Sequence, residues 1–241
     1  RGKRDEVVIA TKVGVEMSPD QKGLSGPYIL RAVEASLRRL QTDYIDLYQS
    51  HVDDPETPQE ETLEAYAQLI REGKVRAIGA SNFTGERLES ALQIAEQRGL
   101  PAYTCVQPHY NLMERREFEQ GVAIVAQRRE LGVIPYFALA SGFLTGKYRS
   151  EADLGDRPRG QGVRKYLDGR GLRVLAALDE VSAQYDATPA QIAIAWLLGR
   201  PWVTAPIASA TSMDQLDQLL RGAQIRLSES AIERLNLASA F

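Results

Sequence analysis

Short apolar runs alternate along the chain with longer stretches in which apolar residues recur at helical spacing. Short runs bounded by turn residues are typical of buried strands, and a 3.6-residue period is typical of amphipathic helices. The pattern predicts strands at 7–12, 45–51, 75–80, 104–107, 133–137 and 203–207. It predicts helices at 27–40, 58–72, 86–97, 117–129, 172–184, 192–198, 213–220 and 229–237. Because strands and helices alternate, the fold class is α/β with a parallel sheet.

Local signals refine this pattern at a few points. Thr57-Pro58-Gln59-Glu60 and Thr188-Pro189-Ala190-Gln191 each have the spacing of a capping box, with proline at the first helical position. Pro135 is unfavourable inside a central strand, because it has no backbone N–H to donate. The glycine-rich connection 140–170 is long for a compact domain, and it fits either a surface loop or a lid over a bound cofactor.

Polar side chains recur at the carboxyl ends of successive predicted strands. Lys12 ends the first run and His51 the second, and Ser81-Asn82 and Gln107 follow the next two. In parallel β/α folds the active site gathers at this edge of the sheet. A lysine and a histidine brought together there are a plausible pair for proton-transfer chemistry.

Composition and charge narrow the class of protein. With 241 residues and 44% apolar content, the chain can bury one full core, so residues 1–241 are expected to form a single domain. With a net charge of −3 and scattered Lys and Arg, the sequence gives no sign of a basic surface that would bind nucleic acid or an anionic membrane. One cysteine excludes an internal disulfide, and with two histidines a zinc site is not expected. No apolar run approaches the ~18 residues of a membrane span, so a cytoplasmic protein is expected.

Five strings of residues, at 8–14, 35–51, 73–83, 107–112 and 139–148, together resemble the aldo-keto reductases. The resemblance is strongest to a bacterial and plant branch that also resembles the voltage-gated potassium channel β subunits. It implies a TIM (β/α)8 barrel, of which the sequence supplies about six of the eight strands. The two N-terminal β/α units of that barrel have no counterpart in the sequence, and they are expected to precede it.

The resemblance implies an NAD(P)H-dependent oxidoreductase that reduces aldehydes or ketones to alcohols by hydride transfer. That family uses an Asp, Tyr, Lys and His tetrad, in which Lys12 matches the lysine and His51 the histidine. The tetrad Asp and Tyr lie upstream of the lysine in the family, in an Asp-x-Ala-x-x-Tyr context. No such string occurs in this sequence.

The resemblance also implies cofactor contacts. Ser81, Asn82 and Gln107 match the positions that bind the nicotinamide carboxamide, Tyr136 matches the ring that stacks on the nicotinamide, and residues 137–147 match the loop over the pyrophosphate. The matched contact residues are Ser81, Asn82, Gln107, Tyr136, Phe137, Leu139, Ser141, Lys147, Ile207, Ser209, Thr211, Gln215 and Gln218. NADPH is the expected cofactor and NADH is possible, because Ser209, Thr211, Ser212 and Gln215 replace basic residues of the family pattern.

Two other functional classes remain open. A barrel of this branch could bind nucleotide as a regulatory or partner module with little turnover. An unrelated barrel lyase could use Lys12 as a Schiff base. The sequence does not identify the carbonyl substrate or the oligomeric state, although Val52, Asp53, Phe83 and His109 fall near the expected pocket.

Overall fold

The parallel strands of the sheet are connected by helices, as the alternation predicts. The computed structural model describes residues 2–155 and 160–241, and in it the chain divides into two units. Unit 1 extends to Pro108 and also contains Gly121–Gly132, whereas unit 2 contains His109–Gln120 and Val133–Phe241. The single domain expected for residues 1–241 stays a prediction.

Unit 1 contains the strands that carry the predicted catalytic residues. They are β1 (Ala10–Val13), β2 (Ile45–Ser50), β3 (Val75–Ser81) and β4 (Cys105–Gln107), all parallel and adjacent in chain order. Across the sheet, Lys12 lies opposite Gln49, Gln49 opposite Gly79, and Gly79 opposite Cys105. This register brings the carboxyl ends of the four strands to one edge.

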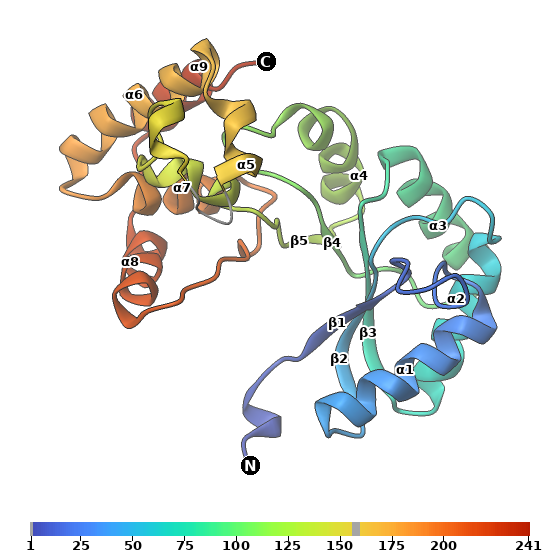
Figure 1. Cartoon of the computed structure of the whole chain (residues 1–241). Helices are drawn as coiled ribbons and strands as arrows, with labels where there is room; N and C mark the ends of the chain where they lie inside the picture. The colour runs from blue at the N-terminus through green and yellow to red at the C-terminus, as the bar shows by residue number, and fades with distance from the viewer. Residues whose placement is uncertain (1, 156–159) are drawn as a thin grey trace. The chain divides into compact units, whose positions relative to one another are not determined.

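The helices of unit 1 bury the apolar stripe that the sequence pattern indicates. They are α1 (Gly26–Leu40), α2 (Gln59–Arg71), α3 (Gly85–Arg98) and α4 (Ala123–Arg128), with a 3-10 turn, η1, at Arg4–Glu6. Figure 1 shows α1, α2 and α3 alongside β1–β3. Ile29 and Val33 of α1 are fully buried, and burying an aliphatic side chain of this size contributes about 1.5–3 kcal/mol. The predicted helix 117–129 begins instead with a π-helical turn, η2, at Phe118–Val122.

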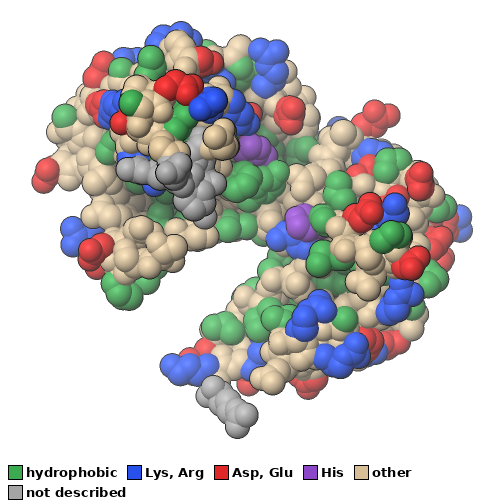
Figure 2. Space-filling model, viewed as in Figure 1, with side chains coloured by type: hydrophobic (Ala, Val, Ile, Leu, Met, Phe, Trp, Pro, Cys, Tyr) green, Lys and Arg blue, Asp and Glu red, His purple; other side chains and the backbone are tan. Residues whose placement is uncertain are grey.

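Unit 2 is mainly helical. Its longer helices are α6 (Gly169–Tyr185), α7 (Pro189–Leu198), α8 (Met213–Gln224) and α9 (Glu229–Ala238), and α7 packs against α6 and α8. The expected long connection contains the short helices η3 (Ala140–Thr145), η4 (Glu151–Asp153), α5 (Gly160–Val163) and η5 (Arg164–Tyr166), while 156–159 lie outside the described residues. Trp196 of α7 is fully buried, and its indole Nε1 donates to Asn236 Oδ1 at 2.9 Å. Figure 2 shows hydrophobic side chains on the surface of α8, where Met213, Leu216 and Leu220 are exposed.

Two strand predictions need correction. The run 133–137 forms only the two-residue strand β5 (Gly132–Val133), and the run 203–207 forms no strand. The N–H groups of Thr204 and Ile207 do donate to the carbonyls of Val133 and Pro135, each at 2.8 Å. However, Pro135 and Pro206 have no N–H to donate, so the ladder cannot continue through either residue. The described residues therefore contain five strands, not about six.

The two predicted capping boxes have different outcomes. At α7 the box is confirmed, because Thr188 Oγ1 accepts from Gln191 N at 3.3 Å and Gln191 Oε1 accepts from Thr188 N at 2.8 Å. At α2 the prediction is wrong. There Thr57 donates its hydroxyl to Asp54 Oδ2 at 2.7 Å, and Glu60 pairs with Arg98. The Thr57 hydroxyl thus binds a charged acceptor, and Pro58 is the N-cap residue, with no side chain accepting from the first N–H groups of the helix.

Candidate active site

Lys12 and His51 lie at the carboxyl ends of neighbouring strands of unit 1. The hydrogen-bond ladder between β1 and β2 continues past the end of β2, where His51 N donates to Val13 O at 2.8 Å. Both side chains are half-buried. The sheet register therefore holds an ammonium and an imidazole at the same edge, as the strand-end pattern predicts.

The electrostatics of the pair favour a neutral imidazole. Burial lowers the pKa of Lys12, and no carboxylate in the described part of the chain pairs with its ammonium. Burial also lowers the pKa of His51, and the positive charge of Lys12 lowers it further. His51 is consequently held in the neutral form around pH 7, in which one ring nitrogen can donate a hydrogen bond.

Three predicted cofactor residues of unit 1 are joined by hydrogen bonds at the ends of β3 and β4. Asn82 has a left-handed backbone with φ 55° and donates from Nδ2 to His51 O at 2.8 Å and to Ser81 Oγ at 3.2 Å. Ser81 in turn donates to Gln107 O at 2.7 Å. Ser81 and Gln107 are buried, with 2% and 5% of their surface exposed. Short amide and hydroxyl groups fixed in this way fit the donors and acceptor of a planar carboxamide.

Gln49 is a member of this cluster that the sequence pattern did not single out. It is fully buried in β2, opposite Lys12, and its Oε1 accepts from Gln107 Nε2 at 3.3 Å. Its Nε2 is buried without a hydrogen-bond partner among the described residues. An amide inside a strand predicted to be buried was the available signal, because a polar group in a core position needs a partner. The orphaned donor supplies a further polar group beside Gln107.

In unit 2, Tyr136 is packed against an aromatic neighbour. The ring of His109 stacks on it with centroids 5.2 Å apart and an interplanar angle of 17°, and Phe137 contacts both rings edge-on. His109 Nε2 is buried without a described partner, and burial lowers the pKa of the imidazole. The stack leaves Tyr136 half-buried, in a fixed ring orientation.

The loop after Tyr136 has an unusual backbone. Ala140, Ser141 and Gly142 follow one another with φ values of 48°, 57° and 97°, a left-handed sequence that costs energy at the two non-glycine positions. A Cβ on Gly142 would lie 3.5 Å from Lys147 Nζ, so the exposed ammonium folds back over this glycine. Small residues and a cation brought together in one loop fit a diphosphate group. Leu139 is half-buried at the start of the loop.

The predicted adenosine-binding residues lie at the exposed start of α8. Thr211 donates its N–H to Gln215 Oε1 at 2.9 Å, and Ser212 caps the helix by accepting from Gln215 N at 3.2 Å. Ile207 and Ser209 are exposed in the segment that leads to the helix.

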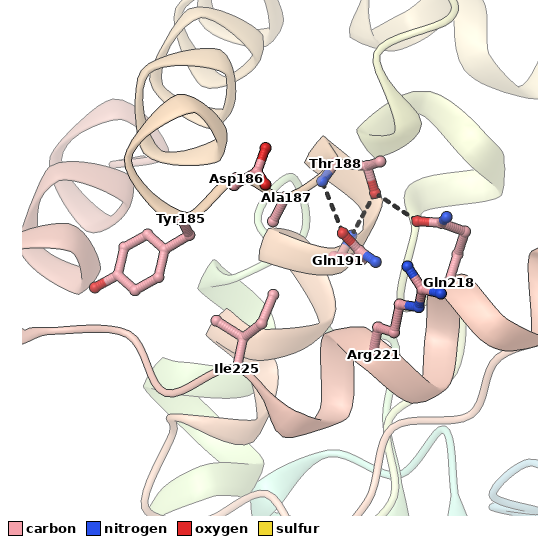
Figure 3. Close-up of a pocket in the computed structure, with 8 residues that line it drawn as sticks. All are labelled: Tyr185, Asp186, Ala187, Thr188, Gln191, Gln218, Arg221 and Ile225. Carbon is pink, nitrogen blue, oxygen red and sulfur yellow. Dashed lines mark hydrogen bonds between the residues drawn. The ribbon is translucent and has the colours of Figure 1, made fainter.

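Gln218 lies one turn along α8, at the edge of a pocket of about 410 Å³ between α7 and α8 (Figure 3). In this pocket Thr188 donates its hydroxyl to Gln218 Oε1 at 3.3 Å. Of the predicted cofactor residues, the pocket contains only Gln218.

The predicted residues therefore form three groups: the strand-end set of unit 1, the 136–147 segment, and the start of α8. Of the residues expected near the substrate, Asp53 pairs with Arg87 at 2.7 Å and Phe83 contacts Tyr103 edge-on within unit 1, whereas His109 lies in the aromatic stack of unit 2. The described residues contain no group of His, Cys, Asp and Glu that could hold a metal ion. None of the described helices is long and apolar enough to cross a bilayer.

Several proteins have sequences similar to this chain. It is 36% identical to the uncharacterized oxidoreductase YrpG of Bacillus subtilis, over 97% of the chain and 72% of that protein. It is 33% identical to the L-glyceraldehyde 3-phosphate reductase of Escherichia coli, over 89% of the chain and 64% of that protein. A putative voltage-gated potassium channel subunit beta of Schizosaccharomyces pombe is 34% identical over 88% of the chain and 64% of its own length. The chain thus spans about two thirds of the length of these relatives.

The family model of the aldo/keto reductases matches residues 1–239, which is nearly the whole chain. The (β/α)8 barrel is the fold of that family, and the parallel α/β arrangement of β1–β4 with α1–α3 is compatible with part of such a barrel. The match and the strand-end placement of Lys12 and His51 agree with the resemblance seen in the sequence. The chain belongs to the aldo/keto reductase family.

Proposed function

We propose that the protein is an NAD(P)H-dependent oxidoreductase that reduces aldehydes or ketones to alcohols. The observation that carries this proposal is the strand-end edge of unit 1, where Lys12 and a neutral His51 lie beside the Ser81, Asn82 and Gln107 cluster. Family membership supports it, and so do the oxidoreductase names of similar proteins.

In this proposal His51 orients the carbonyl group. A neutral imidazole can donate a hydrogen bond to the carbonyl oxygen, and that bond strengthens as negative charge develops on the oxygen. Lys12 acts through its positive charge, which stabilises either the developing oxyanion or the phenolate of a nearby proton donor. In the tetrad of the family a tyrosine hydroxyl delivers the proton to the oxygen, and residues 1–241 contain no string that matches the context of that tyrosine.

Each unit offers groups that fit one part of a nicotinamide nucleotide. Ser81, Asn82 and Gln107 would bind the carboxamide, and Tyr136 with its His109 support would stack on the ring. The Ala140–Gly142 backbone and Lys147 would hold the diphosphate. When bound, the reduced nucleotide supplies the hydride.

The partner proposed for the protein is a small carbonyl compound, with no nucleic acid or membrane, and the proposed location is the cytoplasm. The net charge of −3 and the single cysteine support this. Similarity to an L-glyceraldehyde 3-phosphate reductase makes a short hydroxyaldehyde the first substrate to test.

The test is consumption of NADH or NADPH by the full-length protein with glyceraldehyde, followed by the absorbance of the reduced nicotinamide. Aldehyde-dependent consumption and formation of the alcohol are the expected results. Nucleotide binding without consumption of any aldehyde or ketone would contradict the proposal.

That outcome would favour a regulatory or partner module, the second candidate, which rests on similarity to potassium channel β subunits. A third candidate, a Schiff-base lyase, predicts that borohydride traps the substrate covalently on Lys12. The reductase proposal expects no such adduct.

A further inference from the structure

At the start of α8, the N–H and hydroxyl donors already form hydrogen bonds with side chains of the same segment. Gln215 Oε1 accepts from both the N–H and the hydroxyl of Thr211, at 2.9 and 3.1 Å, and Ser212 Oγ accepts from Gln215 N at 3.2 Å. The free N–H groups at a helix start are what makes it a site for anions. Here an amide oxygen already lies on the Thr211 donors, so a phosphate would have to displace it.

The charges along this segment also disfavour a phosphate. Residues 201–220 contain no Lys, Arg or His, and they contain Asp214 and Asp217 in the first two turns of α8. A phosphate monoester carries about −1.5 to −2 charges at pH 7. The helix dipole offers only about half a positive charge at this end, which two carboxylates offset. Charge-assisted hydrogen bonds, the strong ones for phosphate, are therefore missing from the segment.

The first cation after this segment is Arg221, in the last turn of α8. It lies in the pocket beside Gln218 and Thr188 (Figure 3). It lies nine positions after the N-cap Ser212, which corresponds to a rise of about 13 Å along the helix. That distance exceeds the length of an arginine side chain, so Arg221 does not supply the missing charge at the helix start.

A ribose hydroxyl has different needs. It carries no charge and can donate one hydrogen bond, and both Gln215 Oε1 and the Asp214 carboxylate are exposed acceptors at this point. An acidic side chain that accepts from the ribose 2′-hydroxyl is the usual way in which a protein selects a dinucleotide without the 2′-phosphate.

We propose that the start of α8 selects against the 2′-phosphate, so that the protein binds NAD(H) in preference to NADP(H). The inference rests on the proposed function, since it takes the α8 start as the adenosine end of the nucleotide site. It departs from the NADPH expected from the family resemblance. Gln215 determines this preference, because its amide oxygen already accepts from the donors of Thr211. The carboxylates of Asp214 and Asp217 add electrostatic repulsion of the 2′-phosphate.

The test is calorimetric titration of the full-length protein with NAD⁺ and with NADP⁺, which measures binding without turnover. The wild-type protein is expected to bind NAD⁺ about tenfold or more tightly than NADP⁺, a difference of about 1.4 kcal/mol. Thr211→Arg places a guanidinium at the helix start and removes the hydroxyl that Gln215 binds. This variant is expected to gain about tenfold in affinity for NADP⁺, with little change for NAD⁺.

The matched control is Leu220→Arg, which adds the same charge at an exposed position, 55% accessible, near the other end of α8. It is expected to leave both affinities unchanged. The inference is overturned if wild-type protein binds NADP⁺ as tightly as NAD⁺, or if Thr211→Arg gains nothing for NADP⁺. In both cases the proposed reductase function stands. If neither nucleotide binds, the proposed function fails, and the inference fails with it.

Discussion

The strand-end cluster of unit 1 and the start of α8 in unit 2 are held in different ways. In unit 1, Gln49, Ser81 and Gln107 are buried and joined to one another across three neighbouring strands. At α8, the contacts of Thr211, Ser212 and Gln215 stay within five consecutive positions of an exposed segment. The register of a sheet depends on many residues, whereas a helix start depends on a few. The buried cluster of Gln49, Ser81 and Gln107 is therefore hard to alter without loss of structure, whereas the nucleotide preference proposed for α8 is accessible to single substitutions.

The largest effect is expected from Lys12→Met, which removes the charge at the strand-end edge but keeps an apolar stem. Turnover should fall by ~10²–10⁴-fold, the usual contribution of a positioned acid–base group. Affinity for the nucleotide should largely survive, because Lys12 is not among the residues proposed to hold it. Steady-state kinetics with glyceraldehyde and a nucleotide titration measure the two effects separately.

Lys22→Met is the matched control for this variant. Lys22 is an exposed lysine of unit 1, and its ion pair with Glu16 is long, at 3.5 Å. Turnover near the wild-type value in Lys12→Met, or an equal loss in Lys22→Met, would remove Lys12 from the mechanism.

In unit 1 the sheet register holds separate segments together. In unit 2, which lacks that register, a buried ion pair has part of this role. Arg115 pairs with Glu119 at 2.9 Å and donates to Asn236 O and Ser239 Oγ of the α9 region, each at 2.9 Å. Arg115→Met leaves Glu119 buried without its cation, which is expected to cost about 3–5 kcal/mol of unfolding free energy. Denaturant unfolding measures this loss.

The exposed pair Arg149–Asp179, 2.6 Å long, provides the comparison within the same unit. Its arginine and aspartate side chains are 45% and 44% accessible, so Arg149→Met is expected to cost about 1 kcal/mol or less. Equal losses of unfolding free energy in Arg115→Met and Arg149→Met would show that burial of the Arg115 pair does not add to its contribution to stability.

Gly79 tests how tightly the sheet of unit 1 is packed beneath the candidate site. A Cβ at this position would lie 2.8 Å from Cys105 Sγ and 3.1 Å from Gln49 Cγ. Gly79→Ala is expected to lower the unfolding free energy by about 1–3 kcal/mol, the usual cost of overpacking. In a Cys105→Ala background the same change should cost less, because the closest contact is gone. If the two costs were the same, the strain would not come from the thiol.

The positions of the side chains proposed to be catalytic could be predicted from the sequence because strand ends mark them. Lys12 and His51 each close an apolar run, and parallel strands place such residues at one edge. Gln49 was not predicted, because its importance comes from the register between β2 and its neighbours, which the sequence does not display. The sixth strand was wrongly predicted for a different reason: the apolar residues of 203–207 were given more weight than Pro135 and Pro206, which the sequence shows and which interrupt the pairing.

The start of α8 shows a second limit. The residues that replace basic side chains could be seen in the sequence, but the hydrogen bonds from Thr211 to Gln215 could not. A side-chain oxygen has several possible donors within a few residues, and the geometry decides among them. Thr57 illustrates the same competition, since its hydroxyl binds Asp54 in place of the α2 backbone.

A smaller effect is expected from the two threonines that precede helices. Thr188→Ala removes the capping-box bond from Gln191 N to Thr188 Oγ1 and keeps the one donated by the backbone N–H of residue 188, and about 1 kcal/mol of unfolding free energy should be lost. Thr57→Ala removes only the bond to Asp54, which still accepts from Leu24 N at 2.8 Å. The loss in Thr57→Ala is therefore expected to be smaller. A larger loss at Thr57 than at Thr188 would contradict the assignment of the caps.

The smallest effect is expected in a pH titration that compares one histidine of each unit. The chain has two histidines, His51 in unit 1 and His109 in unit 2, and burial lowers the pKa of each below the usual 6.5. Because the unfolded chain binds protons more readily than the folded one, these groups should reduce stability as the pH falls through 6.5. NMR titration of the two imidazoles should show both midpoints below 6.5. Lys12→Met should raise the midpoint of His51, because the neighbouring positive charge is removed, and should leave that of His109 unchanged. An unchanged His51 midpoint would mean that Lys12 and His51 are not electrostatically coupled, and the strand-end pair would lose its main support.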